Sequence, residues 1–326
     1  MGKNILRCVG GIMVMLWLSG CVSAPQSDAL LTHFSQRLGA SPSVALSARI
    51  QLEQVPFFPQ QDFQCGPAAL ATVLQASKVD IHPEALVAQV FVPARQGSLQ
   101  IEMLAAARRY GRISQILAPD LEKLLEQVQA GKPVLVMQNL GLSWYPQWHY
   151  AVVVGFDLPR AEIVLRSGLV RDYRISLALF ERTWQRAEHW AVVLLAPGEL
   201  PSDEREDAYF QSVSAFAALA NRDGRAIALA YEAGLQRWPT STNLGMARAN
   251  LWYAQGDYDS AVLAYEAIIA RVPDYAAGHN NLAQTLLDLG RLDEAKKHAE
   301  RAVLIGGSFS ENFRITLDAI DSALGL

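Results

Sequence analysis

Two side chains in the first half of the chain have the types and setting needed to attack a carbonyl carbon. Cys65 stands before Gly66-Pro67 and a run of good helix formers, so we expect its thiol at the start of a helix. Backbone N–H groups and the helix dipole favour a thiolate there, which predicts a lowered pKa. His149, at the start of an apolar run, is the candidate base. The pair predicts a cysteine nucleophile.

A cysteine before a helix and a histidine on a strand is the arrangement of papain-like enzymes. In such enzymes the oxyanion is held by the N–H of the cysteine and by a side-chain amide. Gln60, upstream of Cys65, can supply that amide. The aromatic loop at 143–148, just before His149, reads equally as core packing or as the wall of a peptide cleft.

The elements that must hold these groups are predicted over residues 54–196. Helical spacing of apolar residues and short apolar runs typical of strands both occur in this range. We expect helices at 68–76, 99–110 and 120–130, and strands at 133–137, 150–156, 162–165 and 190–195. Because helices come first and closely spaced strands later, the pattern favours an α+β domain.

The motif Gln60-x4-Cys65-Gly-Pro-Ala-Ala-Leu, followed by His149-Tyr-Ala-Val-Val-Val-Gly, resembles the bacteriocin-processing (double-glycine) cysteine peptidases, a papain-like group. The resemblance covers residues 54–196. It implies Cys65 as nucleophile, His149 as general base and acid, and Gln60 as the oxyanion amide. The double-glycine substrate is not carried over, because it belongs to cytosolic domains fused to transporters.

The sequence departs from that family in two places. In many members the glutamine lies one residue farther from the cysteine, where this chain has Pro59. The family's third residue is an Asp or Asn about sixteen positions after the histidine, and the stretch 164–168 contains neither. Ser167 could orient His149 weakly. Asp157 could do so if its loop folds back, and otherwise it is a turn residue between two strands.

Residues 1–20 carry the marks of a secretory signal peptide. Lys3 and Arg7 precede an apolar stretch of about 11 residues, shorter than the roughly 20 that span a bilayer. The segment 18–21, Leu-Ser-Gly-Cys, resembles the lipobox of bacterial lipoproteins, which implies cleavage before Cys21 and lipidation of that cysteine. An uncleaved anchor or an ordinary signal peptide is the alternative.

Several acyl chains would hold the protein firmly on a membrane. By the same resemblance, the absence of Asp at position 22 favours the outer membrane, with the protein facing the periplasm. Residues 21–53 then form the lipidated cysteine and a tether with room for one helix. With Cys8 removed and Cys21 acylated, Cys65 is the one free thiol of the mature chain.

Composition excludes several classes of protein. A chain of 326 residues that is 51% hydrophobic has ample material for folded domains. The formal net charge of −4, or −6 after the cut, gives no support to a nucleic-acid partner. We expect no cofactor and no metal, since the spacing of cysteines and histidines suits no metal site. His82, His189, His279 and His298 are predicted to be surface residues.

The last third of the chain repeats with a period of 34 residues. The spacing separates three pairs of matching residues: Pro239 and Pro273, Gly256 and Gly290, Ala261 and Ala295. This period is typical of tetratricopeptide repeats, which the segment 281–299 resembles closely. Residues 197–207 are predicted to be a linker, and 208–326 an all-α solenoid that binds peptide or protein partners on its concave face.

Three functions fit these observations. The first is a lipid-anchored cysteine peptidase whose repeats recruit a substrate or partner. The second is an inactive peptide-binding protein, which the missing Asp or Asn favours. The third is an assembly factor that acts through the repeats alone.

Overall fold

The computed structural model describes residues 23–37, 46–60, 64–202, 204–219 and 223–326. The chain divides into two compact units. The N-terminal unit is Met1–Leu194 with Pro201–Glu204, and the C-terminal unit is Leu195–Leu200 with Arg205–Leu326. The predicted signal peptide and Cys21 lie outside the described residues. Among the described residues, no helix combines the length and apolar character needed to cross a bilayer.

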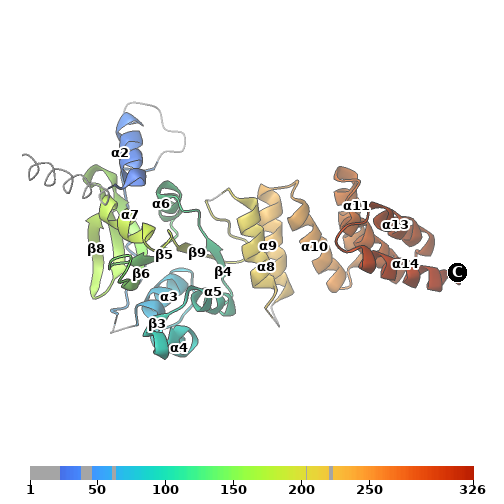
Figure 1. Cartoon of the computed structure of the whole chain (residues 1–326), viewed down its shortest axis with the longest axis horizontal. Helices are drawn as coiled ribbons and strands as arrows, with labels where there is room; N and C mark the ends of the chain where they lie inside the picture. The colour runs from blue at the N-terminus through green and yellow to red at the C-terminus, as the bar shows by residue number, and fades with distance from the viewer. Residues whose placement is uncertain (1–22, 38–45, 61–63, 203, 220–222) are drawn as a thin grey trace, which may run out of the picture. The chain divides into compact units, whose positions relative to one another are not determined.

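Seven strands of the described residues form one sheet in the N-terminal unit (Figure 1). Its order is β4-β9-β5-β6-β7-β8, and β1 pairs with β6. The strands are β1 (Arg49–Gln51), β4 (Ile113–Ile116), β5 (Val134–Asn139), β6 (Trp148–Asp157), β7 (Glu162–Ser167), β8 (Val170–Ser176) and β9 (Ala191–Leu195). The strands that pair with β5, β6 and β7 run antiparallel to them. Short connections between successive strands allow such pairing.

Helices cover both faces of this sheet. They are α3 (Cys65–Ala76), α5 (Gln100–Arg109), α6 (Leu121–Gln129) and α7 (Leu177–Gln185). Side chains alternate along a strand, so two successive residues of β5 point to opposite faces of the sheet. Met137 is bonded to Gln100 of α5 at 3.7 Å, and Gln138 donates to Thr183 of α7 at 2.6 Å. A sheet of antiparallel pairs with helices packed on it confirms the α+β prediction.

A short segment of helices and a two-stranded hairpin follows α3. It consists of α4 (Pro83–Val90), β2 (Phe91–Val92), the 3-10 helix η2 (Pro93–Arg95) and β3 (Gly97–Ser98). β2 and β3 pair antiparallel. Strands of two residues carry no detectable periodicity, so the sequence analysis missed this hairpin.

The N-terminal unit begins before residue 54, which corrects the predicted boundary. The range predicted as a tether contains α2 (Pro25–Arg37), which packs against α6 and α7, and β1, which pairs with β6 through Ile50 and Phe156. Ala24, Ser27 and Leu30 are buried, at the three-residue spacing of one helix face. The polar composition of this range hid these contacts, because only one narrow stripe of the helix is apolar.

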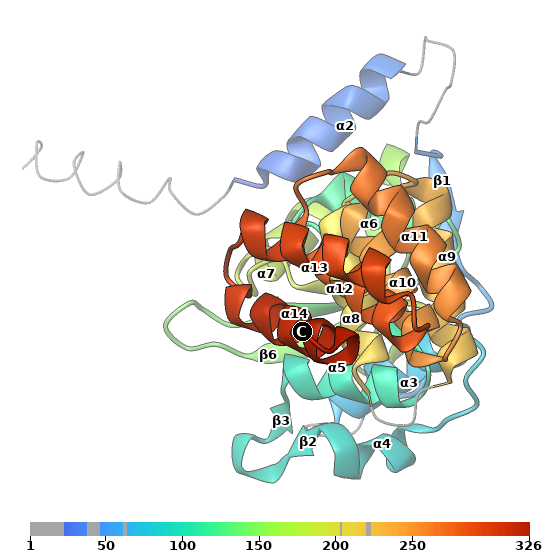
Figure 2. The same cartoon turned by 90° about the vertical axis from the view of Figure 1, so that its right-hand side faces the viewer.

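The C-terminal unit is all helical, as predicted. Its helices are α8 (Glu206–Ala217), α9 (Gly224–Arg237), α10 (Thr242–Ala254), α11 (Tyr258–Arg271), α12 (Ala276–Asp288), α13 (Leu292–Ile305) and α14 (Ser310–Leu324). Consecutive helices pack against one another, and Figure 2 shows the last five side by side. Gly256 and Gly290 have φ of 79° and 72° at the turns between paired helices. Ala261 and Ala295 are fully buried where helices meet.

One histidine of this unit, His279, contradicts the surface prediction. His279 of α12 is 6% exposed, and its Nδ1 lies 3.0 Å from Nδ1 of His298 on α13. The other ring nitrogen of His279 bonds the carbonyl oxygen of Pro273 at 3.0 Å. A buried polar ring needs such partners. One comes from α13 and the other from the turn before α12, and the sequence alone does not show that these groups meet.

Candidate active site

Cys65 opens α3 and lines a cleft of about 850 Å³. Gly66 lets the first turn of α3 approach the β2–β3 hairpin. A β-carbon at position 66 would lie 2.2 Å from Ser98 Oγ, so any larger residue would displace the β2–β3 hairpin. Glycine at the position after Cys65 is therefore required by packing, because the hairpin comes too close for a side chain.

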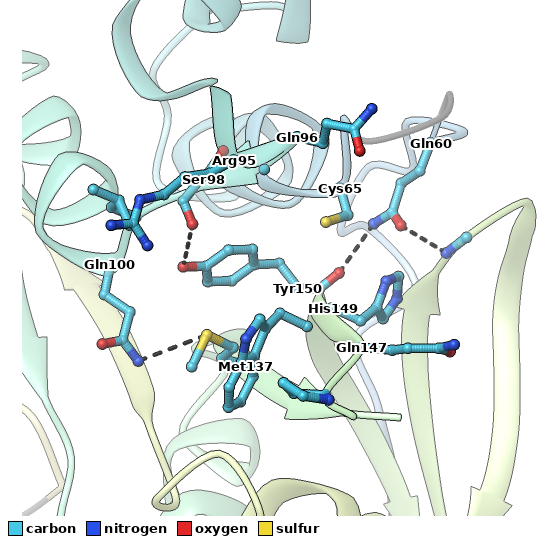
Figure 3. A pocket seen from close by; sticks show the side chains of 15 residues that line it. Gln60, Cys65, Arg95, Gln96, Ser98, Gln100, Met137, Gln147, His149 and Tyr150 are labelled. Carbon is cyan, nitrogen blue, oxygen red and sulfur yellow. Dashed lines mark hydrogen bonds between the residues drawn. The ribbon is translucent and has the colours of Figure 1, made fainter. Parts of the chain in front are cut away.

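His149 is the second residue of β6, on the side of the cleft opposite the hairpin. Its Nε2 lies 2.9 Å from Ser167 Oγ, and Ser167 is the last residue of β7. The backbone N–H of Tyr150 is hydrogen-bonded to the Cys65 sulfur. Figure 3 shows Cys65, His149 and Gln60 converging on one end of the cleft. The structure therefore brings the predicted nucleophile and base together.

Gln60 is fixed at both ends of its amide group (Figure 3). Its oxygen accepts from the Gly168 N–H at 3.0 Å, and its nitrogen donates to the Tyr150 carbonyl at 3.2 Å. The Gln60 backbone N–H also donates to the Gly168 carbonyl, at 3.0 Å. An amide nitrogen carries two hydrogens, so one remains for an oxyanion beside Cys65.

One turn therefore holds two functional groups. Ser167, the last residue of β7, contacts His149, and Gly168, the next residue in the turn to β8, holds the Gln60 amide. The sequence analysis singled out Ser167 but missed Gly168. The signal for Gly168 was available, because a glycine between two short strands marks a turn, and this one has φ of 58°.

The alternative orienting residue, Asp157, does not approach His149. It lies eight residues farther along β6, about 26 Å at the rise of a strand. Its buried carboxylate pairs with Arg49 at 2.7 Å and accepts from the Arg160 N–H at 3.3 Å. Asp157 is a turn residue between two strands, which corrects its candidacy as an orienter.

Burial controls the protonation of the candidate pair. Burial raises the pKa of the Cys65 thiol, and this outweighs the opposite influence of the backbone N–H groups of Tyr150, Gly66 and Cys65. The lowered pKa expected from the helix N-terminus is therefore wrong for the free protein. Burial also lowers the pKa of His149. Both shifts favour a neutral thiol beside a neutral imidazole.

Two segments of the chain form the walls of the cleft. One is formed by residues 95–100 of the hairpin and the start of α5, and the other by residues 146–150. Trp148 is 54% exposed and lines the cleft, while Trp144, at the tip of the preceding loop, is 81% exposed. These side chains are not core packing. The described residues contain no cluster of three or more His, Cys, Asp or Glu side chains that could hold a metal ion.

Asn139 builds the loop that carries these aromatic side chains. Its Oδ1 accepts from the N–H groups of Gly141 and Gln147, both at 2.9 Å. The Arg186 guanidinium donates to its carbonyl oxygen at 2.9 Å. The loop is thus braced from inside although its tip faces solvent.

Comparison with known families finds one match in each structural unit. Residues 52–191 match the family described as Peptidase_C39 like, and residues 246–311 match the tetratricopeptide repeat. Comparison with curated proteins gave no match.

Some solved structures are similar to the first part of the chain and others to the second. A C39-like peptidase from Bacillus anthracis is 18% identical with a TM-score of 0.39, covering 46% of this chain and 98% of that one. The peptidase domain of Streptococcus ComA, a bifunctional ABC transporter involved in quorum sensing, is 21% identical with a TM-score of 0.36, covering 44% and 99%. The tetratricopeptide domain of Sgt2 from Aspergillus fumigatus is 19% identical with a TM-score of 0.34, covering 38% and 81%.

The protein therefore has an N-terminal C39-like peptidase domain of mixed helix and sheet, followed by an all-helical tetratricopeptide region. The family resemblance and the fold class predicted from the sequence are confirmed.

Proposed function

We propose that this protein is an exported, lipid-anchored cysteine peptidase that hydrolyses peptide bonds through Cys65 and His149. The observation that carries the proposal is the meeting of three groups at one end of a cleft. These are the thiol at the start of α3, the imidazole held by Ser167, and the amide held by Gly168.

The chemistry follows from the neutral pair. As the Cys65 sulfur attacks the peptide carbonyl carbon, its proton passes to His149. The carbonyl oxygen gains negative charge, which the Gln60 amide and the Cys65 N–H stabilise. The His149 imidazolium then protonates the departing amine, leaving a thioester on Cys65. Water, deprotonated by His149, attacks the thioester, releases the acid product and restores the thiol.

Of the groups in this mechanism, Ser167 is expected to contribute least to the rate. A hydroxyl fixes the direction of the imidazole, but it carries no charge to stabilise the imidazolium that forms during attack. We therefore expect slow turnover compared with enzymes that use an Asp at this place. The same observation favours the second candidate, an inactive peptide-binding protein.

The location and the repeats complete the proposal. The lipobox at 18–21 supports lipid attachment through Cys21 and a place at the outer membrane, facing the periplasm. The tetratricopeptide region would recruit a peptide or protein, since such arrays present a concave binding face.

Purified full-length protein incubated with a peptide library tests the proposal, with products identified by mass spectrometry. We expect cleavage that Cys65→Ser reduces at least 10³-fold while the circular dichroism spectrum stays the same. Cys21→Ala serves as the matched control, because it should release the protein from membranes and leave cleavage intact. Equal cleavage by Cys65→Ser would reject the peptidase, and unchanged membrane attachment of Cys21→Ala would reject the anchor.

A further inference from the structure

The start of α2 is fixed to the N-terminal unit by a buried carboxylate. Glu181 of α7 is 1% exposed, and its two oxygens accept the backbone N–H groups of Gln26 at 2.9 Å and Ser27 at 2.6 Å. A carboxylate at a helix N-terminus satisfies donors that have no partner inside the helix and also complements the helix dipole.

The Gln26 side chain adds a second set of bonds at the same point. Its oxygen accepts from the Leu121 N–H at 2.6 Å, and its nitrogen donates to the Pro119 carbonyl at 3.2 Å. These bonds tie α2 to the start of α6 as well as to α7. Ala24, Ser27 and Leu30 lie buried along the same face, so polar and apolar contacts fix the helix together.

This docking shortens the distance over which a lipid on Cys21 could move. Only Val22 and Ser23 stand between Cys21 and the buried Ala24. Three residues span about 10 Å when fully extended. A free tether up to β1 would be far longer: an unstructured chain of about 28 residues has a root-mean-square length of roughly 30 Å.

The anchored end and the cleft lie at different ends of the N-terminal unit. Figures 1 and 2, which share a vertical axis, both draw α2 at the upper end and β3 at the lower end. β3 contributes Gly97 and Ser98 to the wall of the cleft.

We infer that α2 is a rigid mount that holds the α2–α7 end of the unit against the membrane surface and keeps the cleft away from it. The inference rests on the proposed lipidation of Cys21. It deepens the proposed function by naming the substrate class: extended peptide segments that stand clear of the bilayer, rather than segments next to a membrane-spanning or lipidated end.

Energy transfer to the membrane measures this arrangement. The full-length protein with Cys65→Ala is reconstituted in phosphatidylethanolamine–phosphatidylglycerol vesicles that contain an acceptor-labelled lipid. A donor dye is placed by Gln185→Cys, at the exposed last residue of α7, or by Arg95→Cys, at the exposed edge of the cleft.

We expect clearly higher transfer from position 185 than from position 95. A matched variant with 20 Gly/Ser residues inserted between Ser23 and Ala24 leaves the docked helix untouched. It adds roughly 25 Å of root-mean-square length, so the difference between the two positions should shrink.

Mass spectrometry of the same samples separates two failures. A lipidated Cys21 with equal transfer from both positions, or with no response to the insertion, would overturn the rigid mount while leaving the anchored peptidase standing. An unmodified Cys21 would overturn the anchor, and the mount with it.

Discussion

Two half-buried histidines, one in each unit, have pKa values shifted in the same direction for the same main reason, but their surroundings differ. Burial lowers the pKa of His149 in the cleft, and burial together with His279 lowers the pKa of His298 in the repeats. His149 has Ser167 on one side and a cleft with a thiol on the other. His298 faces another imidazole, whose far nitrogen bonds a backbone carbonyl.

The comparison shows that a perturbed histidine is not by itself a site. Both rings lie between packed elements and have hydrogen-bond partners. Of the two, only His149 lines a cleft together with a thiol and a fixed side-chain amide, those of Cys65 and Gln60. Perturbed pKa values indicate function only when such geometry accompanies them.

The largest expected difference in activity is between a variant of His149 and a variant of His298. His149→Ala removes the proton acceptor for Cys65, so we expect kcat/KM for peptide cleavage to fall about 10³-fold or more. His298→Gln, the matched control in the repeats, should leave kcat/KM unchanged. Steady-state cleavage of one peptide by both variants measures this. Equal effects of the two replacements would remove the distinction between the two histidines.

Gln60→Glu asks whether the amide acts as a donor to the oxyanion. The new carboxylate can still accept from Gly168, but it cannot donate to the oxyanion, and it adds like charge. We expect kcat to fall about 10²- to 10³-fold with little change in KM. A change confined to KM in the same cleavage assay would instead assign Gln60 to substrate binding.

Ser167→Ala sharpens the role of the hydroxyl beside His149. The imidazole would lose its contact with the Ser167 hydroxyl at 2.9 Å, so we expect about a tenfold fall in kcat and partial recovery in Ser167→Thr. The pH profile of kcat/KM should move as well, because Ser167 contacts the titrating ring. An unchanged profile in Ser167→Ala would mean that the hydroxyl does not position the base.

Alkylation of Cys65 reports the direction of its pKa shift. Burial raises the thiol pKa, so the rate of reaction with iodoacetamide should rise with pH and have its midpoint above the ordinary value of about 8.5. Because the lowered pKa of His149 keeps that ring neutral, cleavage should lose activity on the acid side only below about pH 6.5. A thiol midpoint below 8.5 would indicate a preformed ion pair.

The pH dependence of repeat stability is the smallest expected effect. The folded pKa of His298 lies below its unfolded value, so unfolding takes up protons and stability falls as pH drops below about 6.5. Urea unfolding of the full-length protein, followed by tryptophan fluorescence, should show a lower midpoint for the repeat transition at pH 5 than at pH 7.5. The difference should diminish in His298→Gln. An undiminished difference would assign the pH dependence to other groups.

Much of the framework was predictable, because the relevant signals are local. Helices α3, α5 and α6 and strands β5, β6, β7 and β9 lie within a few residues of their predicted positions, since each carries its own apolar period. The repeats were visible because Gly256 and Gly290 recur at the turns that need them. The hairpin β2–β3 was not predicted, and for the one helix allowed in the tether the docking on α6 and α7 was not predicted. Short or narrow apolar surfaces show their role only when they pack against a partner.

The sequence by itself determined the candidate nucleophile, base and amide, since Cys65, His149 and Gln60 stand in a motif that can be read along the chain. It also determined the repeat period. Tertiary structure alone decided that Ser167 faces His149, because that contact depends on how β7 pairs with β6. It also showed that Asp157 lies too far away, since the chain from His149 to Asp157 is one extended strand. It likewise decided the direction of the Cys65 pKa, since burial is a property of the packed domain, whereas a helix N-terminus is visible in the sequence.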